Sequence, residues 1–214
     1  MAGTDGQGEG RWERRPGDRP AELMEAALRV FAGRGYRSAR LDEVAAAAGV
    51  TKGTLYHYFA NKEELLRRAL EHYQDRAFGR VADALHAAPE GAPAAERIRV
   101  ALHGLFEGSD PLRAEVLLVL QAAAHEVPEV YREWLRRGPV KGWRLVARLI
   151  AEGQEAGELR RDVDGEVAAR VCVTGLMVQL MWQRHSPELP AMRIGRERLV
   201  EGAVETLLGA LRSR

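Results

Sequence analysis

Apolar residues recur along this chain at intervals of three and four, the spacing that places side chains on one face of an α-helix. In the first such stretch Leu23, Ala27 and Phe31 share a face, and Asp18 precedes them as a candidate N-cap. No stretch alternates apolar and polar residues over several positions, as a half-buried strand would. The pattern therefore predicts an all-α fold in which helices pack on helices.

Glycines, prolines and capping residues divide this pattern into further helices. Gly33 and Gly35 are expected to end the first helix, and Gly49 is expected to end a short second one. Thr51 is expected to cap a short third helix, and Asn61 a fourth. The later expected helices cover residues 94–107, 110–125, 128–134, 139–157, 164–184 and 195–211.

The second and third helices have the features of a helix-turn-helix, in the segment RLDEVAAAAGVTKGTLYHYFANK from Arg40 to Lys62. Ala45 is small enough for a second helix to cross it, and Gly49 can take the positive φ that the turn needs. Leu55 and Phe59 stand four residues apart and form a buried side. Lys52, Thr54, Tyr56 and His57 then face outward with donors, and a B-DNA major groove admits a helix of this size.

At these residues the chain resembles the TetR family of transcriptional regulators. The residues that carry the resemblance are Val30-Phe31-Ala32, Gly35-Tyr36, Val44-Ala45, Ala48-Gly49-Val50, Gly53-Thr54-Leu55-Tyr56, Tyr58-Phe59 and Lys62-Glu63-Glu64-Leu65. They fall between about Pro20 and Leu70, under a third of the chain. One position departs from the family: Ala39 stands where the family often has threonine, and Ser38 or Arg40 can supply the missing polar group.

The resemblance implies a dimeric regulator, a repressor by family default, that binds a near-palindromic DNA operator and responds to a small effector. It implies a helix-turn-helix domain at 18–62 and an effector-binding and dimerisation domain at 63–214, and the glycine-rich, charged composition of 1–17 predicts a flexible arm before them. The residues expected to face base edges are Lys52, Gly53 and Tyr56. Those expected to hold phosphates are Arg40, Thr51, Thr54, His57, Tyr58 and Lys62. For Tyr58 a half-buried packing role stays open, and for His57 a merely solvated one.

The larger C-terminal part resembles the family only in architecture. An apolar wall with few polar groups would suit a lipophilic or aromatic effector. The expected lining residues are Leu102, Phe106, Leu117, Gln121, His125, Trp143, Met177, Met181 and Trp182. Two helical stripes are candidates for a dimer seam: Val167, Val171, Thr174, Gly175 and Val178, and Leu199, Ala203, Thr206, Leu207 and Ala210. For both sets, a place in the monomer core is the alternative.

The composition of the chain is compatible with a DNA-binding regulator but does not by itself indicate one. The formal net charge of the 214 residues is only +1, so bulk charge neither requires nor excludes a nucleic acid partner. The single cysteine, Cys172, excludes an intramolecular disulfide and fits a buried thiol. No apolar run marks a secretory signal or a membrane span, which favours a cytoplasmic protein without a membrane partner.

Two other classes of protein are weaker alternatives. The six histidines form no HExxH pattern, and no nucleotide-binding glycine loop or nucleophile elbow is present, so no cofactor, metal or catalytic residue is expected. A meeting of His103 with His125 across two helices is the best remaining case for a helical enzyme. A helical adaptor that binds only protein is the third interpretation. Specific duplex binding would separate the regulator from both.

Overall fold

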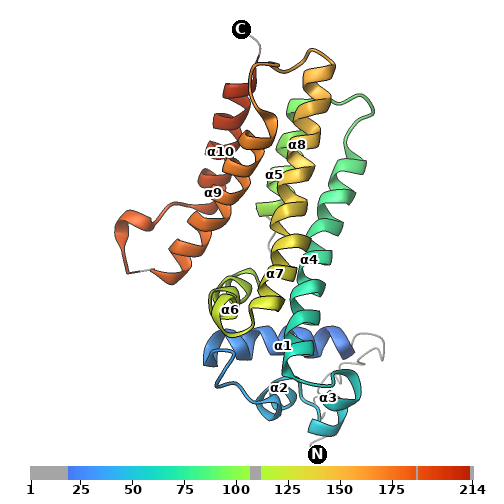
Figure 1. The fold of residues 1–214 in the computed structure, drawn as a ribbon, viewed down its shortest axis with the longest axis vertical. Helices are drawn as coiled ribbons and strands as arrows, with labels where there is room; N and C mark the ends of the chain where they lie inside the picture. The colour runs from blue at the N-terminus through green and yellow to red at the C-terminus, as the bar shows by residue number, and fades with distance from the viewer. Residues whose placement is uncertain (1–18, 107–111, 187, 213–214) are drawn as a thin grey trace, which may run out of the picture.

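The structure, a computed structural model, describes residues 19–106, 112–186 and 188–212, and within them helices form the whole framework (Figure 1). The α-helices are α1 (Arg19–Arg34), α2 (Leu41–Ala47), α3 (Lys52–Tyr58), α4 (Lys62–Ala87), α5 (Ala94–Phe106), α6 (Arg113–Glu126), α7 (Pro128–Arg137), α8 (Pro139–Glu155), α9 (Gly165–His185) and α10 (Arg196–Leu211). A 3₁₀ turn, η2 (Pro190–Met192), lies between the last two. The predicted all-α class is confirmed.

Caps explain several of the helix boundaries. Thr51 accepts a hydrogen bond from the backbone N–H of Thr54, and Asn61 accepts one from that of Glu64, so both predicted caps are present. Of the two glycines predicted to end α1, Gly35 ends it, with φ of 78°, whereas Gly33 lies within the helix. Gly33 has no positive φ, so nothing in its backbone interrupts the helix. The expected arm at 1–17, the Asp18 cap and the start at 110–111 lie outside the described residues.

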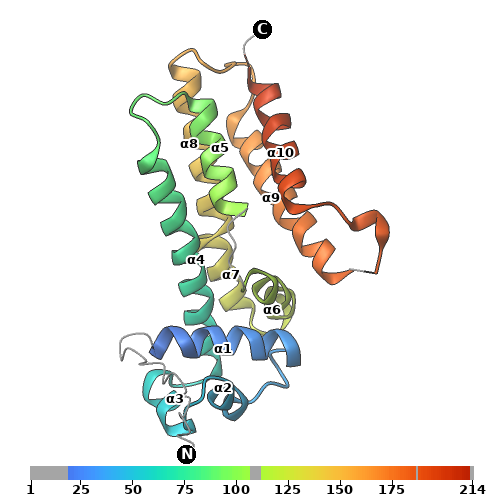
Figure 2. The same ribbon diagram turned by 180° about the vertical axis from the view of Figure 1, so that it is seen from behind.

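The buried side chains form two clusters at opposite ends of the molecule (Figures 1 and 2). The first joins α1, α2, α3 and the first half of α4 to α6 and α7, through side chains such as Phe31, Leu66 and Leu120. The second joins the far half of α4 to α5, α8, α9 and α10, around Ile98 and Ile150. Since α4 belongs to both, it is the continuous rod between the two ends.

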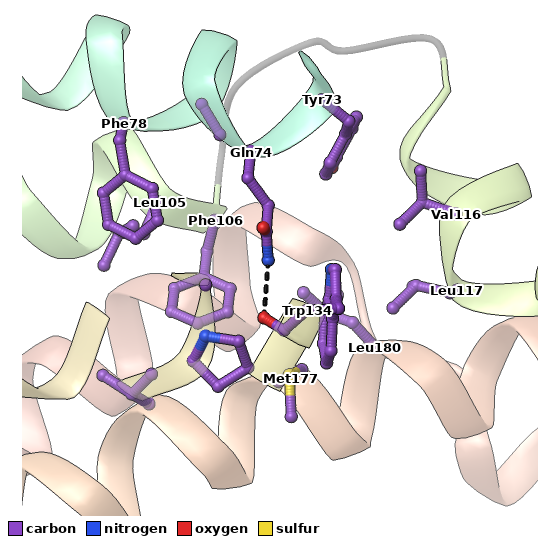
Figure 3. Close-up of a pocket in the computed structure, with 14 residues that line it drawn as sticks. Tyr73, Gln74, Phe78, Leu105, Phe106, Val116, Leu117, Trp134, Met177 and Leu180 are labelled. Carbon is purple, nitrogen blue, oxygen red and sulfur yellow. Dashed lines mark hydrogen bonds between the residues drawn. The ribbon is translucent and has the colours of Figure 1, made fainter. Parts of the chain in front are cut away.

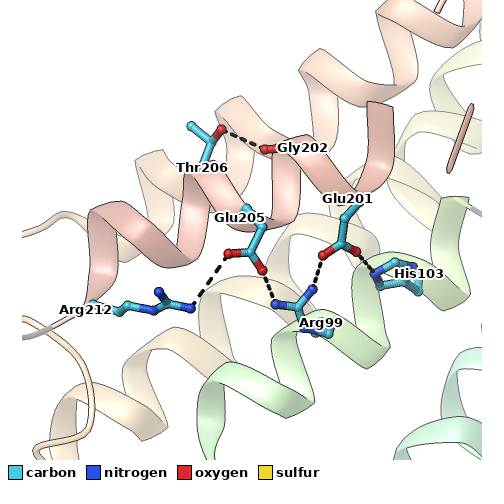
Figure 4. Close-up of polar contacts among 7 residues, drawn as sticks. All are labelled: Arg99, His103, Glu201, Gly202, Glu205, Thr206 and Arg212. Atoms are coloured by element: carbon cyan, nitrogen blue, oxygen red, sulfur yellow. Dashed lines mark hydrogen bonds and ion pairs between the residues drawn. The ribbon is translucent and has the colours of Figure 1, made fainter. Parts of the chain in front are cut away.

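Polar contacts fasten α10 to α5 in the second half (Figure 4). The guanidinium of Arg99 pairs with Glu201 and Glu205, and Nε2 of His103 lies 3.0 Å from a Glu201 oxygen. Pairing with Arg99 holds the pKa of the Glu205 carboxyl below its ordinary value. At the end of α10, a single β-bridge joins Arg212 to Leu159, and Arg160 N–H donates to the Leu211 carbonyl.

No helix in the described ranges combines the length and the apolar character needed to cross a lipid bilayer.

Candidate DNA-binding surface and ligand pocket

The turn between α2 and α3 is built around Gly49. Its φ is 67°, a conformation that side chains with a Cβ rarely adopt. This lets the Val50 N–H reach the Ala45 carbonyl at 2.9 Å and turns the chain directly into α3. Ala45 is buried, so α2 and α3 approach closely where it stands. The local geometry is that of the expected helix-turn-helix.

Helix α3 has one buried side and one open side. Leu55 is 0% exposed and the adjoining Phe59 is 1% exposed, as the spacing predicts. Tyr56 remains 46% exposed and Tyr58 36%, with the His57 ring edge-on to Tyr58. These two tyrosine side chains are thus accessible to a partner molecule.

Several polar side chains on this open side hold one another in place. Oγ1 of Thr51 lies 2.9 Å from Oγ1 of Thr54, within hydrogen-bonding distance. The Lys52 ammonium lies 2.8 Å from an Asp42 oxygen on α2, and this contact raises the pKa of the lysine. The same ammonium sits 5.9 Å from the ring centre of Tyr56. The surface is therefore a positioned array of donors.

Gly53 is the second residue of α3, and no contact within the described protomer explains why this residue is a glycine. A methyl group added there would meet only Oγ1 of Thr51, at an ordinary contact distance of 3.8 Å. Glycine inside a helix is about 1 kcal/mol less favourable than alanine. Neither packing nor a positive φ requires it, so the missing side chain leaves open space on the outer face of α3.

One predicted phosphate contact, Lys62, is engaged within the protein. The Lys62 ammonium donates to the backbone oxygens of Tyr36, Arg37 and Ala39, at 2.7, 3.1 and 3.1 Å. All three of its N–H bonds are thus directed at carbonyls. Arg40 stands at the N-cap of α2, where its backbone N–H donates to the Glu43 carboxylate, while its side chain stays exposed.

A cavity of about 110 Å³ lies between the two core clusters (Figure 3). Helices α4, α5, α6, α7 and α9 line it, with the turn before α8. Its lining residues are Tyr73, Gln74, Ala77, Phe78, Leu105, Phe106, Val116, Leu117, Trp134, Gly138, Pro139, Val173, Met177 and Leu180. None of these lining residues, all within the described chain, carries a charge.

The structure brings three of the predicted ligand residues into this cavity and leaves the others elsewhere. Phe106, Leu117 and Met177 line it. Leu102 is fully buried in the second cluster, and Trp143 packs against that cluster beneath the guanidinium of Arg170. The remaining four predicted residues also lie outside the cavity: Gln121, His125, Met181 and Trp182. Of these, Gln121, His125 and Trp182 are exposed, and Trp182 is 50% exposed.

Sequence reasoning missed the wall that α4 and α7 supply. Tyr73, Gln74 and Phe78 come from α4, and Trp134 from α7. One signal was available: Gln74 stands between Leu70 and Ala77 on the apolar face of α4, where a polar side chain must find a partner. It is only 5% exposed.

An open apolar groove runs between α9 and α10. Val171 is 68% exposed and Val167 54%, although both belong to an otherwise apolar stripe. Gly175 of α9 and Gly202 of α10 line the groove, as do Cys172 and Ala210. By contrast, Leu207 on α10 is only 6% exposed and belongs to the second cluster, so the predicted stripe on α10 is partly core.

Among the described side chains, the histidines form no cluster of metal ligands. His103 pairs with Glu201, and His125 is exposed on α6. Across residues 19–106, 112–186 and 188–212, no three His, Cys, Asp or Glu side chains gather as metal ligands.

Comparison with known families gives matches at both ends of the chain. Residues 23–69 match the model for bacterial regulatory proteins of the tetR family. Residues 109–212 match the model for the C-terminal domain of AefR-like transcriptional repressors. The first match contains the helix-turn-helix, and the second contains α6 to α10.

Individual relatives agree with these matches over most of the chain. The HTH-type transcriptional repressor KstR2 of Mycobacterium tuberculosis is 27% identical over 181 residues, covering 85% of this chain and 89% of its own. The fatty acid degradation regulator FadR from Bacillus halodurans superposes with a TM-score of 0.73 at 25% identity, over 90% of this chain and 99% of its own. AibR, solved in complex with isovaleryl coenzyme A and operator DNA, superposes with a TM-score of 0.62 at 26% identity, over 88% of this chain and 97% of its own.

Proposed function

Because the chain belongs to the TetR family of bacterial transcriptional regulators, we propose that it is a repressor that binds a near-palindromic operator as a homodimer. A small, lipophilic effector releases it from the DNA. The family consists of regulators, and we propose that regulation in the cytoplasm, rather than catalysis, is the role of this chain.

The observation that carries the proposal is the open face of α3. It combines exposed aromatic side chains, a positioned lysine and a glycine for which the protomer gives no reason. A duplex backbone approaching α3 supplies that reason, because a Cβ at Gly53 would stand between the helix and the DNA. Base-edge contacts are assigned to Lys52, Gly53 and Tyr56. Phosphate contacts are assigned to Arg40, Thr51, Thr54, His57, Tyr58 and Lys62. To contact a phosphate, the Lys62 ammonium would have to give up one of its bonds to the backbone carbonyls.

The groove between α9 and α10 is proposed as the dimer seam. Its exposed valines and small residues would let the same two helices of a second protomer pack closely. A dimer would present two copies of α3, and these must match half-sites about 34–36 Å apart. The seam therefore sets the spacing of the two recognition helices.

The cavity is proposed as the effector site, and its position gives a route to the DNA. It lies where the two core clusters meet, and α4 lines it and also carries Lys62, which is bonded to the segment before α2. A ligand that spreads α4 from α7 would tilt α4 and so move α3. AibR was solved with both an acyl thioester and operator DNA, which supports the combination of a small ligand with DNA in this fold.

Selection from random duplexes by mobility shift tests the proposal. The native chain should enrich a two-fold symmetric sequence, and Tyr56→Ala should lose preference for that sequence more than it loses non-specific affinity. Failure to enrich any sequence would contradict the proposal. Linkage adds a second measurement: an effector that weakens operator binding must itself bind more weakly in the presence of operator, by the same factor, typically equivalent to about 1–3 kcal/mol.

A further inference from the structure

The cavity contains two polar atoms without a partner. Oε1 of Gln74 and Nε1 of Trp134 are both buried, and neither has a hydrogen-bond partner among the described residues. Their side chains project into the same cavity from α4 and α7 (Figure 3). Buried polar groups in native proteins almost always find partners, so two unpaired ones facing one cavity indicate a site for an absent molecule.

The orientation of the Gln74 amide is fixed by its neighbours. Nε2 donates to the Trp134 carbonyl at 2.8 Å, and the backbone N–H of Gly138 donates to the same oxygen at 2.9 Å. Turning the amide over would place two oxygens against each other, so Oε1 must be the free atom. A Cβ at Gly138 would overlap Nε2 of Gln74, which explains the glycine at that position.

The two unpaired atoms need hydrogen-bond partners of opposite kinds. Oε1 of Gln74 can only accept a hydrogen bond, and Nε1 of Trp134 can only donate one. A hydroxyl group can do both, since it carries one donor and two lone pairs. The other described residues that line this cavity are mainly apolar, and none of them carries a charge that could neutralise a buried anion.

We propose that the cavity binds an uncharged, mainly apolar molecule through a hydroxyl group that donates to Gln74 and accepts from Trp134. This inference rests on the proposed function, because it specifies the effector of that site. An ionised carboxylate would find no cationic partner among the described residues that line the cavity. The Gln74–Trp134 pair also joins α4 to α7, so the hydroxyl binds at the contact whose opening would move α4.

Two isomeric probes test the hydroxyl directly. The native chain is titrated by calorimetry with 1-octanol, with heptyl methyl ether, and with octanoate. The alcohol and the ether have the same atoms, but the ether has no donor and leaves Oε1 of Gln74 unpaired. We expect 1-octanol to bind about tenfold more tightly than the ether, a difference of about 1.4 kcal/mol, and octanoate to bind more weakly than both.

Variants assign the preference to the two side chains. Gln74→Leu should bind the alcohol and the ether equally, and Trp134→Phe should weaken both, because each probe has an oxygen that accepts from Nε1. Trp143→Phe is the matched control: Nε1 of Trp143 is also buried without a partner among the described residues, but Trp143 does not line the cavity. It should leave both affinities unchanged.

Equal affinity of the native chain for the two isomers would overturn the proposal, as would tightest binding of octanoate, or no binding of any probe. In the first case, water satisfies the two atoms. Operator binding is measured on the same preparation. A chain that selects a duplex but does not prefer the alcohol refutes only the effector chemistry. If the chain binds 1-octanol but selects no duplex, the proposed function as a DNA-binding regulator is refuted.

Discussion

The ammonium of Lys62 donates to the carbonyl oxygen of Tyr36 at 2.7 Å and lies 4.6 Å from the centre of the same residue's ring. One side chain thus ties the first turn of α4 to the segment between α1 and α2. Burial raises the pKa of the Tyr36 phenol, and the nearby Glu63 carboxylate raises it further, so the ring stays neutral. The contact couples the orientation of α4 to that of the helix-turn-helix.

Lys62→Met should therefore lower the stability of the fold. It removes hydrogen bonds from a charged donor and leaves partly buried carbonyls without it, so the free energy of unfolding should fall by about 2 kcal/mol. Urea denaturation measures this. Lys52→Met is the matched control, because Lys52 is exposed and solvent screens its pair with Asp42, so its loss should change the stability much less. An unchanged stability for Lys62→Met would contradict the role of these bonds to the carbonyls, and a shallower salt dependence of its operator binding would support the proposed phosphate contact.

Gly53→Ala should stabilise the protein and impair its function. Alanine is favoured over glycine in a helix by about 1 kcal/mol, and no atom of the described protomer obstructs the new methyl group. Operator affinity should nevertheless fall, because the methyl group would meet the DNA. Gly79→Ala, on the exposed side of α4 with equally open space, should give the same stabilisation without loss of affinity. Equal operator binding by both variants would refute the close approach at Gly53.

Val171→Glu should separate the dimer without unfolding the protomer. The side chain is 68% exposed in a single chain, but a seam between α9 and α10 would bury its charge without a partner. Sedimentation should show a monomer, and circular dichroism should show unchanged helicity. Leu207→Glu should instead unfold the chain, because Leu207 belongs to the second core cluster. Ala82→Glu, exposed on α4, is the control that should remain dimeric. A dimer of Val171→Glu would place the interface elsewhere.

Cys172 should react slowly in the folded protein. Burial raises the pKa of its thiol to about 11, so almost no thiolate is present at pH 8. Alkylation by iodoacetamide should therefore be slow in buffer and fast in urea, as followed by mass spectrometry. The folded chain keeps this proton where the unfolded chain loses it, so stability should fall as pH rises from about 9 towards 11. Cys172→Ser should lose that component; equal alkylation rates in both states would contradict the burial.

The local parts of this protein could be predicted from sequence. The apolar spacing of Leu55 and Phe59, the caps at Thr51 and Asn61 and the turn at Gly49 depend on residues within a few positions of one another, so the sequence alone determined them. The all-α class and the helix-turn-helix follow from these features. Physically, helix periodicity, capping and positive φ are properties of a short segment.

Contacts between distant segments were decided only by the tertiary structure. Lys62 has the appearance of a free surface charge in the sequence, and only the fold brings the carbonyls of Tyr36, Arg37 and Ala39 around it. The pairing of Gln74 with Trp134, sixty residues apart, likewise depends on how α7 packs against α4. The periodicity of apolar residues indicates which face of a helix is buried, but it does not indicate which other helices pack against that face. For that reason only the packing of the other helices shows that Leu102 and Phe106 both belong to the second core cluster and that Phe106 alone also lines the cavity.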